Sequence, residues 1–217
     1  GLKILVTAGP THEAIDPVRF IGNRSSGKMG YAIAQAAARR GAQVTLVSGP
    51  TSLPTPYGVE RVDVTTALEM RDAVLGRLEH VDVVIKAAAV ADYRPRVVAD
   101  QKIKKDGQGD GLTIELVRNP DIAAEIGQQK RPDQTLVAFA AETTDLLENA
   151  RKKLASKGCD LIVANDVSEQ GAGFGVDTNR VQLLYASGEV DALPLMPKAD
   201  VADRILDAVL KLRGVKE

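Results

Sequence analysis

Leu2-Lys-Ile-Leu-Val-Thr7 opens the stretch that decides the fold, which continues through residues 27–40 (GKMGYAIAQAAARR) and 43–47 (QVTLV). The first and last of these segments are short apolar runs rich in Val, Ile and Leu, which predicts buried strands. The middle segment is rich in Ala, has apolar residues at helical spacing and is followed by Gly41, a typical residue for ending a helix. This order of strand, helix and strand predicts a βαβ unit.

The same alternation continues along the rest of the chain. Helices are predicted at residues 67–78, 121–127, 144–157 and 201–212, strands at 81–87, 135–140 and 160–164, and a late hairpin at 181–185 and 190–193. Because strands alternate with helices, the sequence predicts an α/β fold, a Rossmann-like, doubly wound, mostly parallel sheet with helices on both faces. At 217 residues the chain is expected to form a single domain.

Composition excludes several classes of protein. Hydrophobic residues at 44% and charged residues at 26% argue against disorder and against a membrane-spanning chain. A net charge of −1, four Tyr, three Phe and no Trp argue against nucleic acid as a partner. One cysteine, Cys159, and two distant histidines form neither a disulfide nor a zinc site, which favours a reducing, cytoplasmic setting. The start at Gly1, without a signal peptide, predicts a piece of a longer protein.

Two long loops, residues 9–26 and 91–110, follow predicted strands, where open parallel sheets bind their ligands. The first contains Gly22-Asn-Arg-Ser-Ser-Gly-Lys-Met-Gly30, which places glycines and hydroxyls at the start of a helix and predicts an anion site, most naturally for a phosphate. It is not a P-loop, because Met29 stands where Ser or Thr would hold magnesium. The alternative is an ordinary serine cap, with glycines that allow close packing.

The sequence after the second strand bears on a nicotinamide cofactor. It is Ser48-Gly-Pro50, which has neither an acidic residue for a ribose hydroxyl nor an Arg for a 2′-phosphate. A nicotinamide-dependent oxidoreductase is therefore disfavoured. Together with a noncatalytic nucleotide-binding module, it remains the alternative to a nucleotide-dependent enzyme.

Lysine clusters provide further candidates for binding phosphate. Lys102-Ile-Lys-Lys105, followed by the glycine-rich residues 106–111, is either a hinged basic flap or a solvated surface loop. Lys153 and Lys157 are four residues apart on one predicted helix, so their ammonium groups share a face. Such a pair is tolerable if an anion lies between the two charges.

Three further positions lie near predicted strand ends or a helix start. Asp92 follows the small residues 87–91 and is either a turn residue or a ligand for a hydroxyl or a water-bound metal. Asn119-Pro-Asp-Ile122 has the residues of a helix start. Phe139 is either core or a contact for a base or sugar.

Several motifs together carry a family resemblance. They are Ala8-Gly-Pro-Thr-His-Glu13, Asp16-Pro-Val-Arg19, Asn23-Arg-Ser-Ser-Gly-Lys28, Ala88-Ala-Val-Ala-Asp-Tyr93, Lys102-Ile-Lys-Lys105, Asn119-Pro-Asp-Ile122, Phe139-Ala-Ala-Glu142 and Ala164-Asn-Asp-Val167. In this order, from Leu2 to about Leu212, the chain closely resembles phosphopantothenoylcysteine synthetase. The resemblance is to the bacterial type, which forms the carboxyl half of a bifunctional coenzyme A enzyme.

The resemblance implies a reaction and its participants. It implies ligation of 4′-phosphopantothenate to L-cysteine, with CTP as co-substrate, Mg2+ as the assisting ion and an acyl-cytidylate as the intermediate. It also implies a homodimer, a decarboxylase domain linked upstream and no flavin in this domain. A free carboxylate is a poor electrophile, whereas the mixed anhydride with CMP carries a good leaving group.

The resemblance also assigns roles to residues. Lys102 would offset charge at the α-phosphate in the first step, Asn23 would hold the acyl-cytidylate in the second, and Arg19 would help bind phosphopantothenate. The implied nucleotide site consists of Ala88, Asp92, Lys102, Pro120, Asp121, Ile122, Ala123, Phe139, Lys153 and Lys157. The implied substrate site consists of Arg19, Asn23, Ser25, Gly27 and Ala89. Lys86 stands where related enzymes commonly have Gly, and no role follows for it.

Overall fold

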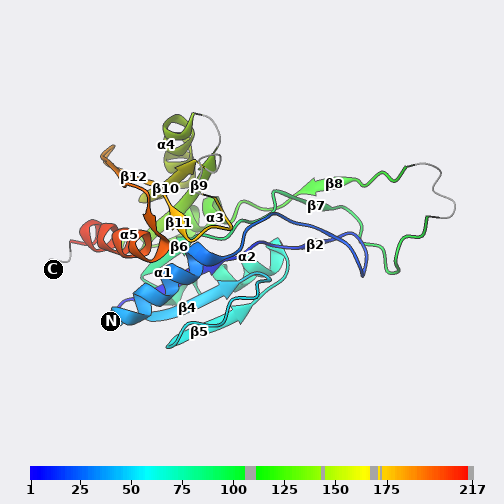
Figure 1. Ribbon diagram of the computed structural model, residues 1–217, viewed down its shortest axis with the longest axis horizontal. Coiled ribbons are helices and arrows are strands. Elements are labelled where there is room, and N and C mark those ends of the chain that lie inside the picture. The colour runs from blue at the N-terminus through cyan, green and yellow to red at the C-terminus, as the bar shows by residue number, and fades with distance from the viewer. Residues whose placement is uncertain (106–110, 143–144, 167–170, 172, 215–217) are drawn as a thin grey trace.

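A central sheet organises the fold (Figure 1), which a computed structural model describes for residues 1–105, 111–142, 145–166, 171 and 173–214. Its eight strands lie in the order β13-β12-β10-β9-β6-β1-β4-β5. In chain order they are β1 (Lys3–Ala8), β4 (Gln43–Ser48), β5 (Val59–Asp63), β6 (Val83–Lys86), β9 (Thr135–Glu142), β10 (Leu161–Asp166), β12 (Gln182–Tyr185) and β13 (Val190–Ala192). From β10 to β5 every pairing is parallel, whereas β12 and β13 are antiparallel to their neighbours.

Helices cover both faces of the sheet. They are α1 (Lys28–Arg39), α2 (Ala67–Leu75), the short 3-10 helix η1 (Leu78–His80), α3 (Ile122–Gln129), α4 (Leu146–Lys157) and α5 (Lys198–Leu212). Successive side chains of a strand point to opposite faces. Val6 of β1 therefore belongs to the core beneath α1 and α5, and Leu5 to the core beneath α2, α3 and α4. Among the described helices, none is long and apolar enough to cross a membrane.

The sheet changes its winding direction between β1 and β6, because β1 pairs with β4 on one side and with β6 on the other. The loops that leave these two strands are bonded to each other. The Thr7 hydroxyl accepts a hydrogen bond from the Ala88 amide at 3.1 Å, and Pro10 and Ala89 form an isolated parallel bridge. A ligand crevice is expected at this point of a doubly wound sheet.

A long arm, defined here as residues 13–21, 93–105 and 111–118, projects from the sheet (Figure 1). Its strands are β2 (Glu13–Ala14) paired with β3 (Phe20–Ile21), and β7 (Tyr93–Pro95) paired with β8 (Leu116–Arg118). The two long loops predicted from the sequence therefore lie together in one extended structure. A last small pair, β11 (Thr178–Asn179) with β14 (Met196–Pro197), precedes α5.

The Asp16 carboxylate ties the two parts of the arm together. It accepts hydrogen bonds from the amides of Val18 and Arg19, each at 2.8 Å, and from the Ile103 amide at 3.1 Å. The Arg19 guanidinium pairs with it at 3.0 Å and also donates to the Ile103 carbonyl at 2.7 Å. Burial by itself raises the pKa of Asp16, but these amide bonds and Arg19 outweigh burial and lower the pKa.

The predicted fold class is confirmed, and several details differ from the prediction. The edge strand β5, the short strands of the arm and the β11–β14 pair were not predicted. The helix predicted at 67–78 ends at Leu75 and is followed by η1. The late hairpin was predicted, but β12 pairs with β10 and simply extends the main sheet. Residue 144, the predicted start of α4, lies outside the described residues.

Candidate active site

A cavity of about 600 Å³ lies at the carboxyl ends of the central strands. Loops after β1 and β6, the start of α1 and the end of α4 all contribute to its lining. Of the residues predicted for the site, it contains Asn23, Ser25, Gly27, Ala88, Ala89, Asp92, Phe139, Lys153 and Lys157. The structure therefore gathers most of the predicted residues around one space.

The N-terminus of α1 opens into this cavity. Its N-cap is Gly27, with φ of +80°, and no side chain caps the helix. The serine-cap alternative is therefore wrong: the Ser25 and Ser26 hydroxyls accept only long bonds, of 3.3 and 3.4 Å, from the amides of Gly27 and Lys28. An uncapped helix start offers N–H groups and the positive end of the helix dipole to an anion.

Gly30 lets α1 approach β1 closely. A Cβ atom at this position would lie 2.5 Å from the Ala8 Cβ and 2.9 Å from the Thr7 carbonyl oxygen. No side chain other than hydrogen fits at this distance. The close-packing role that the sequence allowed for Gly30 is confirmed, and it sets the position of the helix start.

Asn23 connects the glycine-rich loop to the alanine run after β6. Its side-chain amide donates to the Ala89 carbonyl, and its Oδ1 accepts a hydrogen bond from the Ser25 amide at 3.0 Å. The run itself is fixed by the Thr11 hydroxyl, which accepts from the Ala91 amide at 3.0 Å. Small side chains at these positions leave the backbone accessible to a ligand.

A second cavity, of about 320 Å³, adjoins the first. Asp92, Pro120, Asp121, Ile122 and Lys157 are among its lining residues. Asp121 caps α3 by accepting from the Ala124 amide at 3.1 Å, and its carboxylate pairs with Lys157 at 3.0 Å. Burial raises the pKa of Asp121, but these two partners lower it overall. The predicted helix start at this turn is confirmed.

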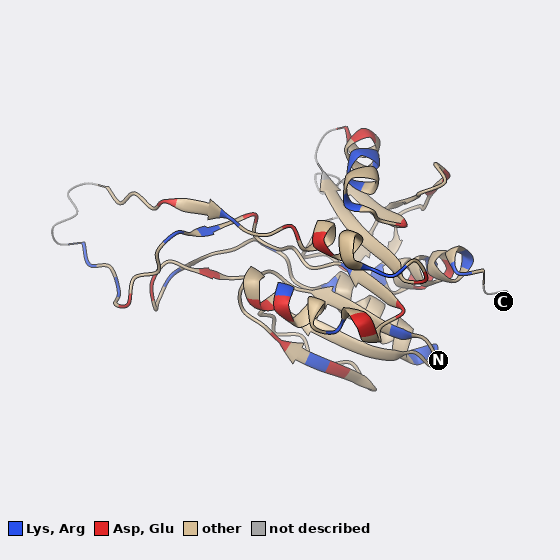
Figure 2. Ribbon diagram, turned by 180° about the vertical axis from the view of Figure 1, so that it is seen from behind, with Lys and Arg blue, Asp and Glu red and all other residues tan. Residues whose placement is uncertain are grey.

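Lys86, at the end of β6, lines both cavities. Burial, and then the positive charge of Lys157, lower the pKa of its ammonium, while Asp121 opposes that shift. Figure 2 shows further basic residues along α4, which carries Lys153. A cation that is partly buried beside other cations is costly unless an anion compensates it.

Several lining residues were not predicted as individual site residues, among them Lys198, Phe174, Asn165 and Asn179. Asn165 belongs to the 164–167 motif, which was a usable signal. Lys198 and Phe174 come together only through the fold. Cys159 is buried, as expected for a small core residue, and burial raises the pKa of its thiol to about 11.

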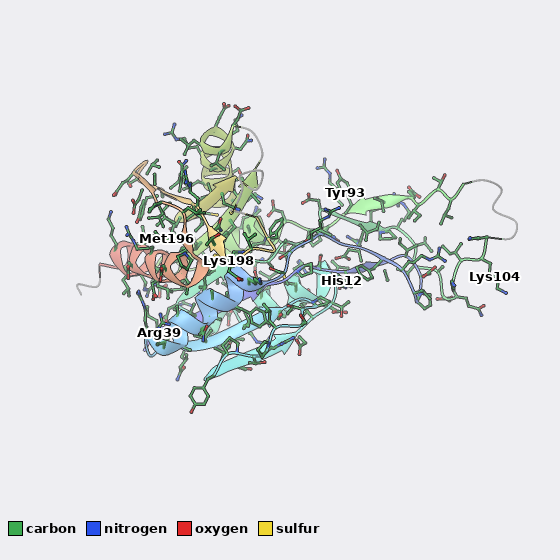
Figure 3. The ribbon with its side chains drawn as sticks, viewed as in Figure 1. His12, Arg39, Tyr93, Lys104, Met196 and Lys198 are labelled. Atoms are coloured by element: carbon green, nitrogen blue, oxygen red, sulfur yellow. The ribbon has the colours of Figure 1, made fainter. Side chains whose placement is uncertain are left out.

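Three predicted residues do not line either cavity. Ala123 is buried in the first turn of α3. Arg19 and Lys102 belong to the arm, and Lys102 is exposed. The neighbouring Lys104 is labelled near the far end of the arm in Figure 3. Within the described chain, the sheet-end cavities and the predicted catalytic lysine are therefore separate. Residues 106–110 of the predicted flap lie outside the described residues.

The structure also bears on the nicotinamide alternative. Ser48, at the end of β4, is fully buried, and its hydroxyl lies 2.8 Å from the Tyr31 hydroxyl. It is therefore not available to bind a ribose. Instead, the cavities offer lysines, helix N-terminal amides and small alanines, a set suited to an anion such as a phosphate.

Comparison with known proteins gives consistent relatives. The chain is 53% identical to the coenzyme A biosynthesis bifunctional protein CoaBC of Bacillus subtilis over 98% of its length, which covers 52% of that protein. It is 53% identical to CoaBC of Escherichia coli K12 over 96% of its length, which covers 52% of that protein. The chain thus spans about half the length of these curated relatives.

A solved structure matches the whole fold. It is the crystal structure of the C-terminal domain of CoaBC, with a TM-score of 0.85 and 46% identity, covering 100% of this chain and 97% of that one. The sequence profile of the DNA/pantothenate metabolism flavoprotein C-terminal domain matches residues 1–212. The chain therefore belongs to the family of DNA/pantothenate metabolism flavoprotein C-terminal domains.

Proposed function

We propose that this chain joins 4′-phosphopantothenate to L-cysteine, with CTP as the activating co-substrate, in the cytoplasm. Its 53% sequence identity to the coenzyme A biosynthesis proteins of Bacillus subtilis and Escherichia coli supports a role in coenzyme A biosynthesis. The observation that carries the proposal is the pair of adjoining cavities at the strand ends: one meets the uncapped start of α1, and Lys86 and Lys157 line both. Such a site can hold an acid beside a nucleotide.

The reaction balances in two steps. The substrate carboxylate attacks the α-phosphorus of CTP, the bond to the β-phosphate oxygen breaks, and pyrophosphate leaves. The amine of cysteine then attacks the acyl carbon, CMP leaves and the amine loses a proton. Lys102 would stabilise negative charge at the α-phosphate, an electrostatic effect of the kind that dominates such steps. Asn23 would hold the acyl-cytidylate between the Ala89 carbonyl and the α1 start.

Magnesium would supply charge neutralisation on the phosphates. Among the described residues, no group of three or more carboxylate, histidine or cysteine side chains could hold a metal. Mg2+ in nucleotide sites is typically bound by one or two carboxylates together with substrate phosphates. Asp92, which lines both cavities, fits that role. No flavin is needed for either step.

The test separates the two steps. Wild-type protein should release pyrophosphate from CTP only when 4′-phosphopantothenate is present. Lys102→Gln should stop this release, and Lys211→Gln, a loss of the same charge on the exposed face of α5 and outside both cavities, serves as the control. Asn23→Asp should still form the acyl-cytidylate, detectable by mass spectrometry, but should not complete the amide. If Asn23→Asp slowed acyl-cytidylate formation and amide formation equally, Asn23 would not act specifically in the second step.

We further infer that the active unit is a homodimer built through the arms. Half of the exposed large hydrophobic residues of the described chain lie in the arm. Those in the arm are Val18, Phe20, Tyr93, Val97, Val98, Leu112 and Leu116. Exposed apolar surface concentrated in this way favours a partner, and a second copy is the commonest one. Pairing of the arms could also bring Lys102 of one chain to the cavity of the other.

Light scattering should give about twice the 23.0 kDa mass of the chain. Mixing inactive Asn23→Asp and Lys102→Gln proteins, with subunit exchange, tests whether sites are shared. Recovered activity would mean that the two residues meet from different chains, and no recovery would place both in one subunit. A fully active monomer would refute the dimer. The bifunctional relatives, about twice as long, support a decarboxylase domain linked upstream, which remains a proposal.

A further inference from the structure

Lys198 is a buried lysine with a complete set of hydrogen-bond acceptors. It is the first residue of α5 and only 6% exposed. Its ammonium donates to the carbonyl oxygens of Gly173 at 3.1 Å, Phe174 at 3.3 Å and Val176 at 2.6 Å. Burial, and then the charge of Lys28, lower the pKa of this ammonium. Burying a charged group is costly, so three convergent acceptors indicate a specific structural task.

The segment 173–177 is held from a second side by the loop at the start of α1. Lys28 donates to the Gly175 carbonyl at 3.0 Å and pairs with the Asp177 carboxylate at 2.7 Å. The Ser26 hydroxyl donates to the Phe174 carbonyl. The Lys198 amide donates to the Asp177 carbonyl at 2.9 Å. Every carbonyl from 173 to 177 therefore accepts a hydrogen bond from one of these three residues.

This arrangement connects the segment to the main cavity. Gly173 and Phe174 line it, together with Ser26, Lys28 and Lys198. Figure 3 places Lys198 at the opposite end of α1 from Arg39, which is the end where the helix starts. The segment contains two glycines, which raise the entropy cost of fixing its backbone. The side-chain donors offset that cost and keep one wall of the cavity in place.

We propose that Lys198 is a positioning residue of this site: its ammonium orders the segment 173–177 and thereby fixes Phe174 as a wall of the main cavity beside Ser26 and Lys28. Its effect on turnover rests on the proposed function, whereas its effect on the segment does not. A displacement of about 1 Å in a catalytic site can cost about 10²-fold in rate. Loss of the ammonium should therefore reduce turnover although Lys198 undergoes no chemistry.

A double-mutant cycle tests the route through Phe174. Lys198→Met and Phe174→Ala should each lower kcat/KM at least about tenfold, and the double variant should be no worse than the poorer single one, because both act on the same wall. Lys211→Met, on the exposed face of α5, is the control and should leave kcat/KM unchanged. Multiplying effects in the double variant, or a folded Lys198→Met with wild-type kcat/KM, would overturn the proposal.

A fluorescence measurement tests the segment without turnover. The chain has no Trp, so Phe174→Trp introduces a single reporter. Phe174 is 37% exposed, so the readout is the anisotropy of the emission rather than its wavelength. Adding Lys198→Met should lower this anisotropy, since the segment is no longer held in place, and Lys211→Met should not. An unchanged anisotropy would refute the positioning role even if the wild type proves inactive as a ligase. If Lys198→Met does not fold, Lys198→Gln carries both tests, because its neutral amide has two N–H donors for the three carbonyl oxygens that Lys198 contacts.

Discussion

Replacing Gly30 by alanine should move the start of α1 away from β1. The added Cβ would lie 2.5 Å from the Ala8 Cβ, whereas ordinary contacts begin at 3.4 Å. The Thr7 carbonyl oxygen, at 2.9 Å, blocks a sideways escape because it is backbone. The helix must therefore shift by about 1 Å, because both opposing atoms belong to a central strand.

The magnitude has two opposing parts. Overpacking of this kind costs about 1–3 kcal/mol, while alanine gains about 1 kcal/mol over glycine within a helix. We therefore expect the free energy of unfolding to fall by about 0–2 kcal/mol. The activity should fall much further, by about 10²-fold. Gly27, the N-cap of α1, lines the cavity, and a shift of the helix start would move it away from its position there.

Two assays separate these effects. Urea unfolding gives the change in stability, and pyrophosphate release gives kcat/KM well below the unfolding transition. Gly76→Ala is the matched control, since Gly76 has φ of −64° at the end of α2 and its Cβ would meet only the Asp72 carbonyl, at 3.1 Å. A Gly30→Ala protein with wild-type kcat/KM would refute the argument that this contact positions the site.

Three further predictions concern charged residues. Lys153→Ala and Lys157→Ala should each raise the KM for CTP by the equivalent of about 1.5–3 kcal/mol. Unchanged KM values would mean that the two lysines are solvated surface residues that do not contact CTP. The pKa of Lys86 is lowered, so the folded chain binds the Lys86 proton less tightly than the unfolded chain does. Burying the charged lysine therefore lowers the free energy of unfolding at neutral pH, and this loss of stability is relieved as pH rises through the lowered pKa. Lys86→Met should therefore raise Tm at neutral pH while weakening CTP binding in calorimetry, and a lower Tm would contradict this. The lowered pKa of Asp16 stabilises the fold above its ordinary value of 3.8, and this contribution is lost as pH falls through the lowered pKa. Asp16→Asn should abolish that part of the acid dependence, as measured by hydrogen exchange at the Ile103 amide.

The central sheet could be predicted because its strands are apolar on both faces. Strand β5 escaped prediction because Val59-Glu-Arg-Val-Asp63 mixes charges into an edge strand, where burial is only partial. The strands of the arm are two or three residues long, too short for any periodicity. Their pairing follows from contacts between distant segments, which a single sequence does not reveal.

The candidate site was predictable where it follows strand ends. Asn23 and Asp92 lie in loops that the sheet topology brings together, and both line the main cavity. Their proposed roles remain predictions. Lys102 also lies in such a loop, but the direction in which a long loop projects depends on tertiary contacts such as that of Asp16 with Ile103. Lys198 escaped notice because a lysine ahead of a helix is usually solvated, and only the fold supplies its carbonyl partners.

The arm has a consequence for how the chain folds. Its two parts are far apart in sequence: Arg19 donates to the Ile103 carbonyl and the Ile103 amide donates to Asp16, across 84 and 87 residues. Closing so long a loop costs entropy that these few contacts cannot recover until β1 and β6 have already paired at the base of the arm. The arm should therefore form after the core, and it should open by local unfolding while the core stays folded. Amides such as that of Ile103 would then exchange in a separate, less protected group, whose opening leaves the β1–β6 ladder intact.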